Sequence, residues 1–247
     1  MKKKILWIFG TLFLVSVAVV VVLTFFLGSI VRAGVNRVGP ALTKTRVELA
    51  DARISPLSGI GTLTGFVVGN PEGWTSDRAL YLGKVHVDLQ PFSLFGDHIV
   101  INEILIDQPE FFYESRLFSS NLKELQKNIQ RSTGGGKDKV EAARTNKGEP
   151  IRIEVRKFTL RNGKISIRVG GGTATAEMRP FELTDLGTKE GGLTTSQLAA
   201  AVTEQILGEV LIVATEAVAK NGWAPAAAAK DAIHSAGEGL KKILGGK

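Results

Sequence analysis

The hydrophobic pattern opens with a long uncharged run. Ile5 to Val31 forms 27 consecutive residues without charge, directly after Lys2, Lys3 and Lys4. As a helix, this run would reach roughly 40 Å at about 1.5 Å per residue, enough to cross a hydrocarbon core of about 30 Å. Basic residues beside such a span favour the cytoplasmic side. The pattern therefore predicts a single membrane span within residues 1–32, with the rest of the chain outside the cytoplasm.

The predicted anchor carries aromatic residues near both of its ends. Its marker positions are Ile5, Trp7, Leu12, Val20, Phe25, Phe26 and Ile30. A cleaved signal peptide is the alternative, but its apolar region spans only about 7–15 residues. Arg32 also stands where a cleavage site requires a small, neutral residue. The sequence therefore favours a retained anchor, followed by a juxtamembrane connector at residues 32–44.

From Thr45 the hydrophobic pattern becomes short and alternating, as is typical of strands. In one of these runs, Val85, Val87 and Leu89 share a face and polar residues occupy the other. A helix is predicted over Asn121–Ile129, with Asn121 as its cap. These elements define a β-rich region at 43–130. Its strand-like runs lie at residues 45–54, 61–69, 82–90, 98–106 and 110–115.

A polar stretch at residues 131–149 interrupts the strand pattern. It holds a glycine triplet, many charges and almost nothing to bury, which predicts a flexible linker. The alternating pattern then resumes over residues 150–184. Within this segment the hydrophobic phase shifts by one between Val155 and Phe158, which predicts a β-bulge.

Asn162-Gly163 is the strongest short turn signal in the chain and predicts a hairpin with a type I′ turn. The return strand of this hairpin would place Ile165, Ile167 and Val169 on one face. A further strand is expected at residues 173–181. Residues 150–184 are thus predicted to continue the sheet as a β-hairpin.

Residues 193–247 are predicted to form a helical pair. Thr195–Lys220 repeats apolar residues at every fourth position, and Pro225–Leu244 is a second, alanine-rich helix. The second helix either packs on the domain or lies on an anionic membrane surface. The predicted fold class is α+β: an N-terminal transmembrane helix, a mostly antiparallel β-sheet domain of groove or sandwich type, and two C-terminal helices.

Composition narrows the function. The net charge of +7 includes the three N-terminal lysines, and no basic stripe elsewhere predicts a nucleic-acid partner. Cysteine is absent, which excludes a disulfide, a thiolate metal site and a cysteine nucleophile. His86, His98 and His234 are far apart and match no metal-ligand spacing. No P-loop, GxSxG or HExxH motif occurs. We therefore predict no catalytic residues, no metal site and no cofactor, and expect a protein that is not an enzyme.

The order of several short motifs resembles the N-terminal region of AsmA-like proteins. The signal anchor comes first, and the turn Asn70, Pro71, Gly73 and Trp74 is similar to a turn of that family. The resemblance covers about half of the chain, which is shorter than typical members. The similar segments are residues 54–63, 68–74, 79–85, 89–95, 101–104, 119–122 and 151–169.

The resemblance implies a β-rich groove in the bacterial envelope, anchored in the inner membrane with its domain in the periplasm. It further implies lipid handling, or maintenance of the outer membrane and envelope. An apolar sheet face would then contact phospholipid, although the same residues would equally form an ordinary core under the C-terminal helices. This face comprises Val85, Val87, Leu89, Ile165, Ile167 and Val169.

A second, looser resemblance concerns residues 45–130. The Asn70-Pro71 turn between alternating strands is similar to that of late embryogenesis abundant domains of type 2, which are small β-sandwiches. The alternative function is therefore a non-enzymatic structural or protein-interaction module of the envelope, with an envelope protein as its partner.

Overall fold

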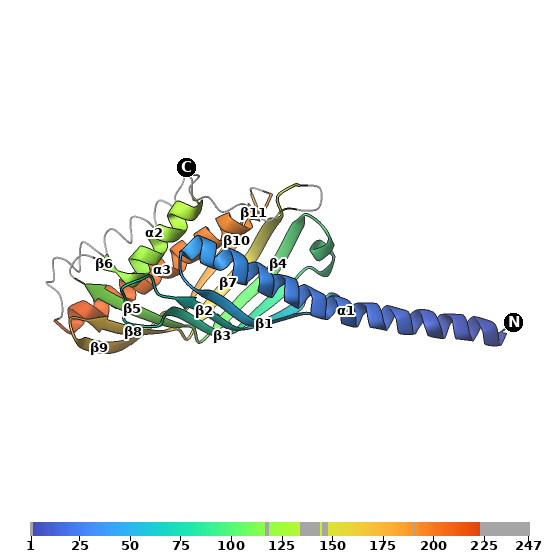
Figure 1. Cartoon of the computed structure of the whole chain (residues 1–247), viewed down its shortest axis with the longest axis horizontal. Helices are drawn as coiled ribbons and strands as arrows, with labels where there is room; N and C mark the ends of the chain where they lie inside the picture. The colour runs from blue at the N-terminus through green and yellow to red at the C-terminus, as the bar shows by residue number, and fades with distance from the viewer. Residues whose placement is uncertain (1, 117–118, 134–143, 145–147, 190, 223–247) are drawn as a thin grey trace.

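The computed structural model describes residues 2–116, 119–133, 144, 148–189 and 191–222, and it has an α+β fold. Three helices pack beside a curved, mixed sheet, and one of them extends far beyond the domain (Figure 1). The helices are α1 (Lys2–Thr43), the short 3-10 helix η1 (Pro91–Phe95), α2 (Asn121–Thr133) and α3 (Thr195–Lys220). The strands are β1 (Val47–Ile54), β2 (Ile60–Gly69), β3 (Arg78–Leu89), β4 (His98–Asp107), β5 (Glu110–Arg116), β6 (Ser119–Ser120), β7 (Arg152–Arg161), β8 (Lys164–Val169), β9 (Gly172–Glu177), β10 (Phe181–Leu186) and β11 (Leu193–Thr194).

Helix α1 is longer than the predicted span, because it continues to Thr43. The expected connector at residues 32–44 is therefore wrong: it is helical up to Thr43. Leu27, Val31 and Val35 of this second half pack against the core, and Leu42 is buried. Asn36 joins the edge of the sheet, because the backbone N–H of Leu49 donates to its Oδ1 at 2.7 Å. Packing on β1 thus outweighs the weak helix propensity of the glycines and of Pro40.

The sheet divides at β3. Strand β2 pairs along one edge of β3, while β4 and β5 share the other edge. One branch then continues through β7 to β10, and the other continues through β8 to β9. The β4–β7 and β5–β8 pairs are parallel. The sheet is therefore mixed, with two parallel pairings inside an arrangement that was expected to be mostly antiparallel.

The predicted hairpin at Asn162-Gly163 is wrong. Strand β7 pairs with β4, β10 and β11, whereas β8 pairs with β5 and β9. The same 54-residue offset relates β4 to β7 and β5 to β8, as in His98↔Arg152 and Glu110↔Lys164. Each pair of consecutive strands is therefore one bent run, and the two runs lie side by side in constant register.

The two bends use equivalent residues. Gln108 (φ 56°) and Asn162 (φ 55°) both adopt left-handed backbone geometry. The N–H of Gln108 donates to the Arg161 carbonyl at 3.0 Å, and the N–H of Lys164 donates to the Pro109 carbonyl at 2.9 Å. Asn-Gly permits the same left-handed geometry in a bend as in a hairpin. Whether Asn-Gly forms a bend or a hairpin is decided by the parallel pairing with β4 and β5, which the local sequence does not reveal.

The predicted phase shift in β7 coincides with an irregularity of the neighbouring strand. The β3–β4 register shifts by one residue between Asp88 and Leu89. Strand β7 follows β4 at constant offset on both sides of this point, from Ile101↔Val155 to Ile104↔Phe158. The extra residue therefore changes the phase of β4 and of β7 at the same level of the sheet. At this level Arg156 donates to the Asn102 Oδ1 at 3.2 Å.

One helix prediction is confirmed in its bounds, and another is confirmed with a different C-terminal end. Helix α3 has the predicted bounds, and the Thr194 side chain caps it in a capping box with Gln197. Helix α2 extends to Thr133, into the expected linker, and the Ser120 hydroxyl accepts from the Lys123 N–H at its start. The predicted cap, Asn121, serves another purpose described below. Most of the linker and all of the second predicted helix, Pro225–Leu244, lie outside the described residues. The strand expected at residues 173–181 is two strands, β9 and β10.

Candidate functional site

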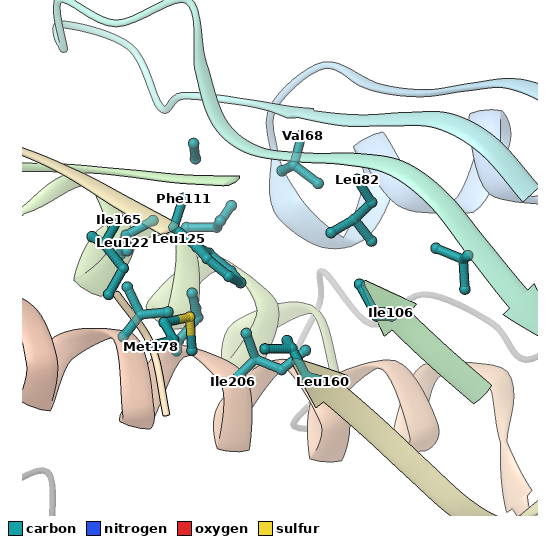
Figure 2. Packing of buried hydrophobic residues seen from close by; sticks show 14 of the residues in the cluster. Val68, Leu82, Ile106, Phe111, Leu122, Leu125, Leu160, Ile165, Met178 and Ile206 are labelled. Carbon is teal, nitrogen blue, oxygen red and sulfur yellow. The ribbon is translucent and has the colours of Figure 1, made fainter. Parts of the chain in front are cut away.

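The six predicted lipid-facing residues divide between the two branches of the sheet. Ile165 and Ile167 are 0% and 2% exposed, and Val169 is partly buried. Helix α2 packs on β5, and α3 packs on β8 and β9. In Figure 2, Leu122 and Leu125 of α2 lie beside Phe111 and Ile165. This branch is therefore filled by its own helices and forms the ordinary core.

Val85, Val87 and Leu89 lie on the part of β3 that pairs with β4, beside the other branch, β4–β7–β10, where coverage by helices is thinner. Helix α3 reaches β7 and β11, and no more than sparse contacts from the described α-helices reach β4 and β10. Val85 and Leu89 are nevertheless buried, while Val87 is only partly buried. The predicted face therefore has two environments, one packed under helices and one less covered.

The less covered branch carries apolar rows that cross its strands. Residues that pair across strands share a face of the sheet. Two such rows are formed mainly by partly buried side chains, and we call them the apolar rows. They are Val87, Ile104, Phe158 and Leu183 in the first row and Ile99, Ile153 and Leu193 in the second.

The opposite face of the same branch is polar. Lys84 and His86 of β3 are exposed. Lys157 bridges Glu182 at 3.3 Å and Glu103 at 3.4 Å. Hydrogen bonds to Glu182 and Glu103 raise the pKa of Lys157, so its ammonium stays charged. Of the two faces of this branch, the one with the apolar rows is therefore the face suited to contact a hydrocarbon chain.

The family-like turn at Asn70–Trp74 is held by a network of hydrogen bonds that includes Asn121 and Glu114, and we call this network the lock. Pro71 is buried, and Gly73 adopts φ 85°, which only glycine reaches without strain. The Asn70 amide donates to the Ser76 carbonyl at 2.7 Å, which closes the turn. The Trp74 indole donates to Glu124 Oε2 at 2.9 Å, and the guanidinium of Arg116 stacks 4.7 Å above its ring. The turn thus ties β2 to α2.

Asn121 lies at the centre of this lock and is 0% exposed. Its Oδ1 accepts from the Glu114 N–H at 2.9 Å. Its amide donates to the Asn70 Oδ1 at 2.7 Å and to the Phe112 carbonyl at 2.6 Å. A buried amide with three hydrogen-bond partners, two for its N–H groups and one for its oxygen, is committed to holding the chain. Asn121 therefore joins the turn to β5 instead of capping α2.

Glu114 supplies the charge of the lock. It is buried, and its carboxylate accepts from the backbone N–H and the hydroxyl of Thr75 at 2.9 and 2.8 Å. It also accepts from the N–H and hydroxyl of Ser76. Burial raises the pKa of Glu114, but the hydrogen bonds from Ser76 and Thr75 outweigh burial and lower the pKa overall. Sequence reasoning missed this carboxylate, because its partners lie 38 and 39 residues away.

The predicted anchor positions lie on α1. Trp7, Leu12, Phe26 and Ile30 are exposed and Val20 is partly buried. The side chains of Ile5 and Phe25 lie outside the described part. By length and composition, two described helices are apolar enough to cross a membrane, α1 and α3. The N-terminal half of α1 projects away from the domain, whereas α3 contributes Ile206, Val210 and Ala214 to the core.

Within the described residues, no group of three or more His, Asp or Glu side chains is placed to hold a metal ion. Comparison with family models, with curated proteins and with solved structures finds no match to this chain. The similarity to AsmA-like proteins therefore stays a prediction from the order of motifs.

Proposed function

We propose that this protein is an AsmA-like module that handles lipid at the surface of the bacterial inner membrane, with its domain on the periplasmic side. The α1 helix, with Lys2, Lys3 and Lys4 before its uncharged run, supports the membrane anchor and its orientation. The two apolar rows support the lipid contact. Envelope maintenance would follow from the movement or sequestration of that lipid.

One observation carries the proposal: the apolar rows lie in the branch that the helices cover least. Ile104 and Leu183 are only partly buried although they face the same side as the core residue Phe158. Partly exposed apolar side chains in contiguous rows are the feature of a surface that binds an apolar ligand. An acyl chain matches such rows, since it needs no hydrogen-bonding partner.

Photo-crosslinking tests this proposal in the full-length chain. Removal of the first 32 residues would cut through α1 where Leu27 and Val31 pack on the core, so a truncated domain is unsuitable. A benzophenone amino acid is placed at Ile104 or at Leu183, and at Lys84 on the polar face as the matched control. The chain is expressed in bacterial membranes, irradiated and analysed by mass spectrometry.

We expect a phospholipid adduct at Ile104 and Leu183 and none at Lys84. Val22, exposed on α1, serves as the positive control for lipid. An adduct at Val22 without any lipid adduct at Ile104 or Leu183 would refute lipid handling by the apolar rows. An adduct of Ile104 or Leu183 with a second polypeptide would favour the alternative, a protein-interaction module.

A further inference from the structure

Outside α1, the described residues include three large hydrophobic side chains that are strongly exposed. They are Leu57 at 71%, Ile60 at 54% and Phe92 at 88%, and we call them the apolar tip. Leu57 lies in the loop between β1 and β2, Ile60 begins β2, and Phe92 lies in η1. Single exposed hydrophobic residues are common on proteins, but their collection at one place is informative.

Backbone contacts hold the two loops of the tip together. The N–H of Leu89 donates to the Gly59 carbonyl at 3.0 Å, and a side chain at Gly59 would overlap the Leu89 carbonyl. Within the first loop, the N–H of Ser55 donates to the Ile60 carbonyl at 2.9 Å. The second loop is closed by Ser93, whose hydroxyl accepts from the Val100 N–H at 3.0 Å. The exposure of Leu57 and Phe92 is therefore built into two hydrogen-bonded turns.

The tip lies at the end of the domain from which α1 projects. Strand β1 runs antiparallel beside α1, with Val47 against Gly39, Leu49 bonded to Asn36, and Ala52 against Gly28. From the first contact to the third, both elements advance about 16 Å, at about 1.5 Å per helical residue and about 3.3 Å per strand residue. The helix and the strand are therefore nearly aligned. Figure 1 shows α1 leaving the domain in this direction.

The same values of rise per residue give the position of the apolar tip along the axis of α1. Ile54, two residues beyond Ala52, lies level with about residue 24 of α1, and the loop that holds Leu57 lies a few residues nearer the N-terminus. The burial of α1 agrees with this extrapolation. Val20 and Leu23 are partly buried, whereas the other described side chains from Trp7 to Val22 are exposed. The domain therefore reaches along α1 to about residue 20.

This level falls within the proposed membrane span. A hydrocarbon core of about 30 Å takes about 20 helical residues, so a span that starts at Ile5 ends near residue 24. We infer that the apolar tip of Leu57, Ile60 and Phe92 enters the outer boundary of the same bilayer that α1 crosses. The inference rests on the proposed anchor but not on lipid handling by the apolar rows. The domain is then seated on the membrane at two places, the span and the tip.

Fluorescence quenching tests the seating, and the absence of cysteine makes the labelling simple. Leu57→Cys and Phe92→Cys are made in the full chain, labelled with a nitrobenzoxadiazole dye, and reconstituted in vesicles of phosphatidylethanolamine and phosphatidylglycerol. The quencher is a phospholipid with a nitroxide on its acyl chain. Val22→Cys on α1 is the control inside the bilayer, and Thr173→Cys, exposed on β9, is the control in water.

We expect quenching at Leu57 and Phe92 within about twofold of that at Val22 and at least about fivefold above that at Thr173, since such contacts enter only the first ~5–10 Å of the boundary. If both tip labels behave like Thr173 while Val22 is quenched, the tip inference is overturned and the anchor stands. Labels that are shielded from aqueous iodide without lipid quenching would assign the tip to a protein partner and also overturn it. If Val22 itself is not quenched, the anchor fails and the tip inference fails with it.

Discussion

Gly28→Ala tests whether α1 is held against β1 as one continuous helix. A Cβ at Gly28 would lie 2.0 Å from the Ala52 carbonyl oxygen, which is backbone and cannot rotate away. Helix and strand must therefore separate by about 1 Å, and overpacking of this kind costs about 1–3 kcal/mol. Replacing glycine inside a helix returns about 0.5–1 kcal/mol. We expect the free energy of unfolding to fall by about 1–2 kcal/mol.

Gly34→Ala is the matched control in the same helix. Nothing lies within 4 Å of a Cβ at Gly34, so the substitution should raise the free energy of unfolding by about 0.5–1 kcal/mol. Gly39→Ala should also be destabilising, because its Cβ would lie 2.5 Å from Cγ1 and 2.7 Å from Cβ of the buried Val47, and that Cβ is fixed by its own backbone. Denaturant titrations of the full chain in detergent micelles, followed by tryptophan fluorescence, measure all three. Equal stabilisation by Gly28→Ala and Gly34→Ala would refute the packing of α1 on β1 and with it the level of the apolar tip.

Two further predictions concern the lock around Asn121. Asn121→Ala removes the hydrogen bonds to three groups, the N–H of buried Glu114 and the partly buried Asn70 and Phe112, and should lower the free energy of unfolding by about 3 kcal/mol. Asn128→Ala, which loses one bond to the Thr43 carbonyl, should cost about 1 kcal/mol. Similar losses from the two substitutions in denaturant titrations would contradict the lock. Because the pKa of Glu114 is lowered in the folded state, its contribution to stability is complete above the unfolded value of 4.5 and is lost as the pH falls through the folded pKa. Glu114→Gln should therefore flatten the decline of unfolding free energy below pH 4.5, and an unchanged slope in a pH series of titrations would remove Glu114 as its source.

Elements whose signal is local were predictable from the sequence. Helix α3 has the predicted bounds because its apolar residues repeat at every fourth position over its whole length. The strands from β1 to β5 lie close to the predicted runs, since alternation alone marks a half-buried strand. The phase shift in β7 was also visible, because the extra residue changes which side chains face the core.

Elements that depend on distant partners were not predictable. Asn162-Gly163 permits a hairpin or a bend, and only the run from β4 to β5, 54 residues earlier, decides for the bend. Residues 32–43 look like a connector until β1 offers them a surface. For the candidate site, alternation identified Val87 but not its row neighbours Ile104 and Leu183, since the order of strands across the sheet is not written in any single strand.

The continuity of α1 limits what the domain is able to reach. Helix α1 continues without a flexible joint from its uncharged run into the segment that packs on the core. It therefore acts as a rigid connection, in contrast to a flexible linker, and it fixes the orientation of the domain. The longest strand run, from His98 to Arg116, spans at most about 60 Å even if straight. Under the proposed function, any donor or acceptor of lipid would have to come to the domain within this short height above the bilayer, at an angle fixed by α1.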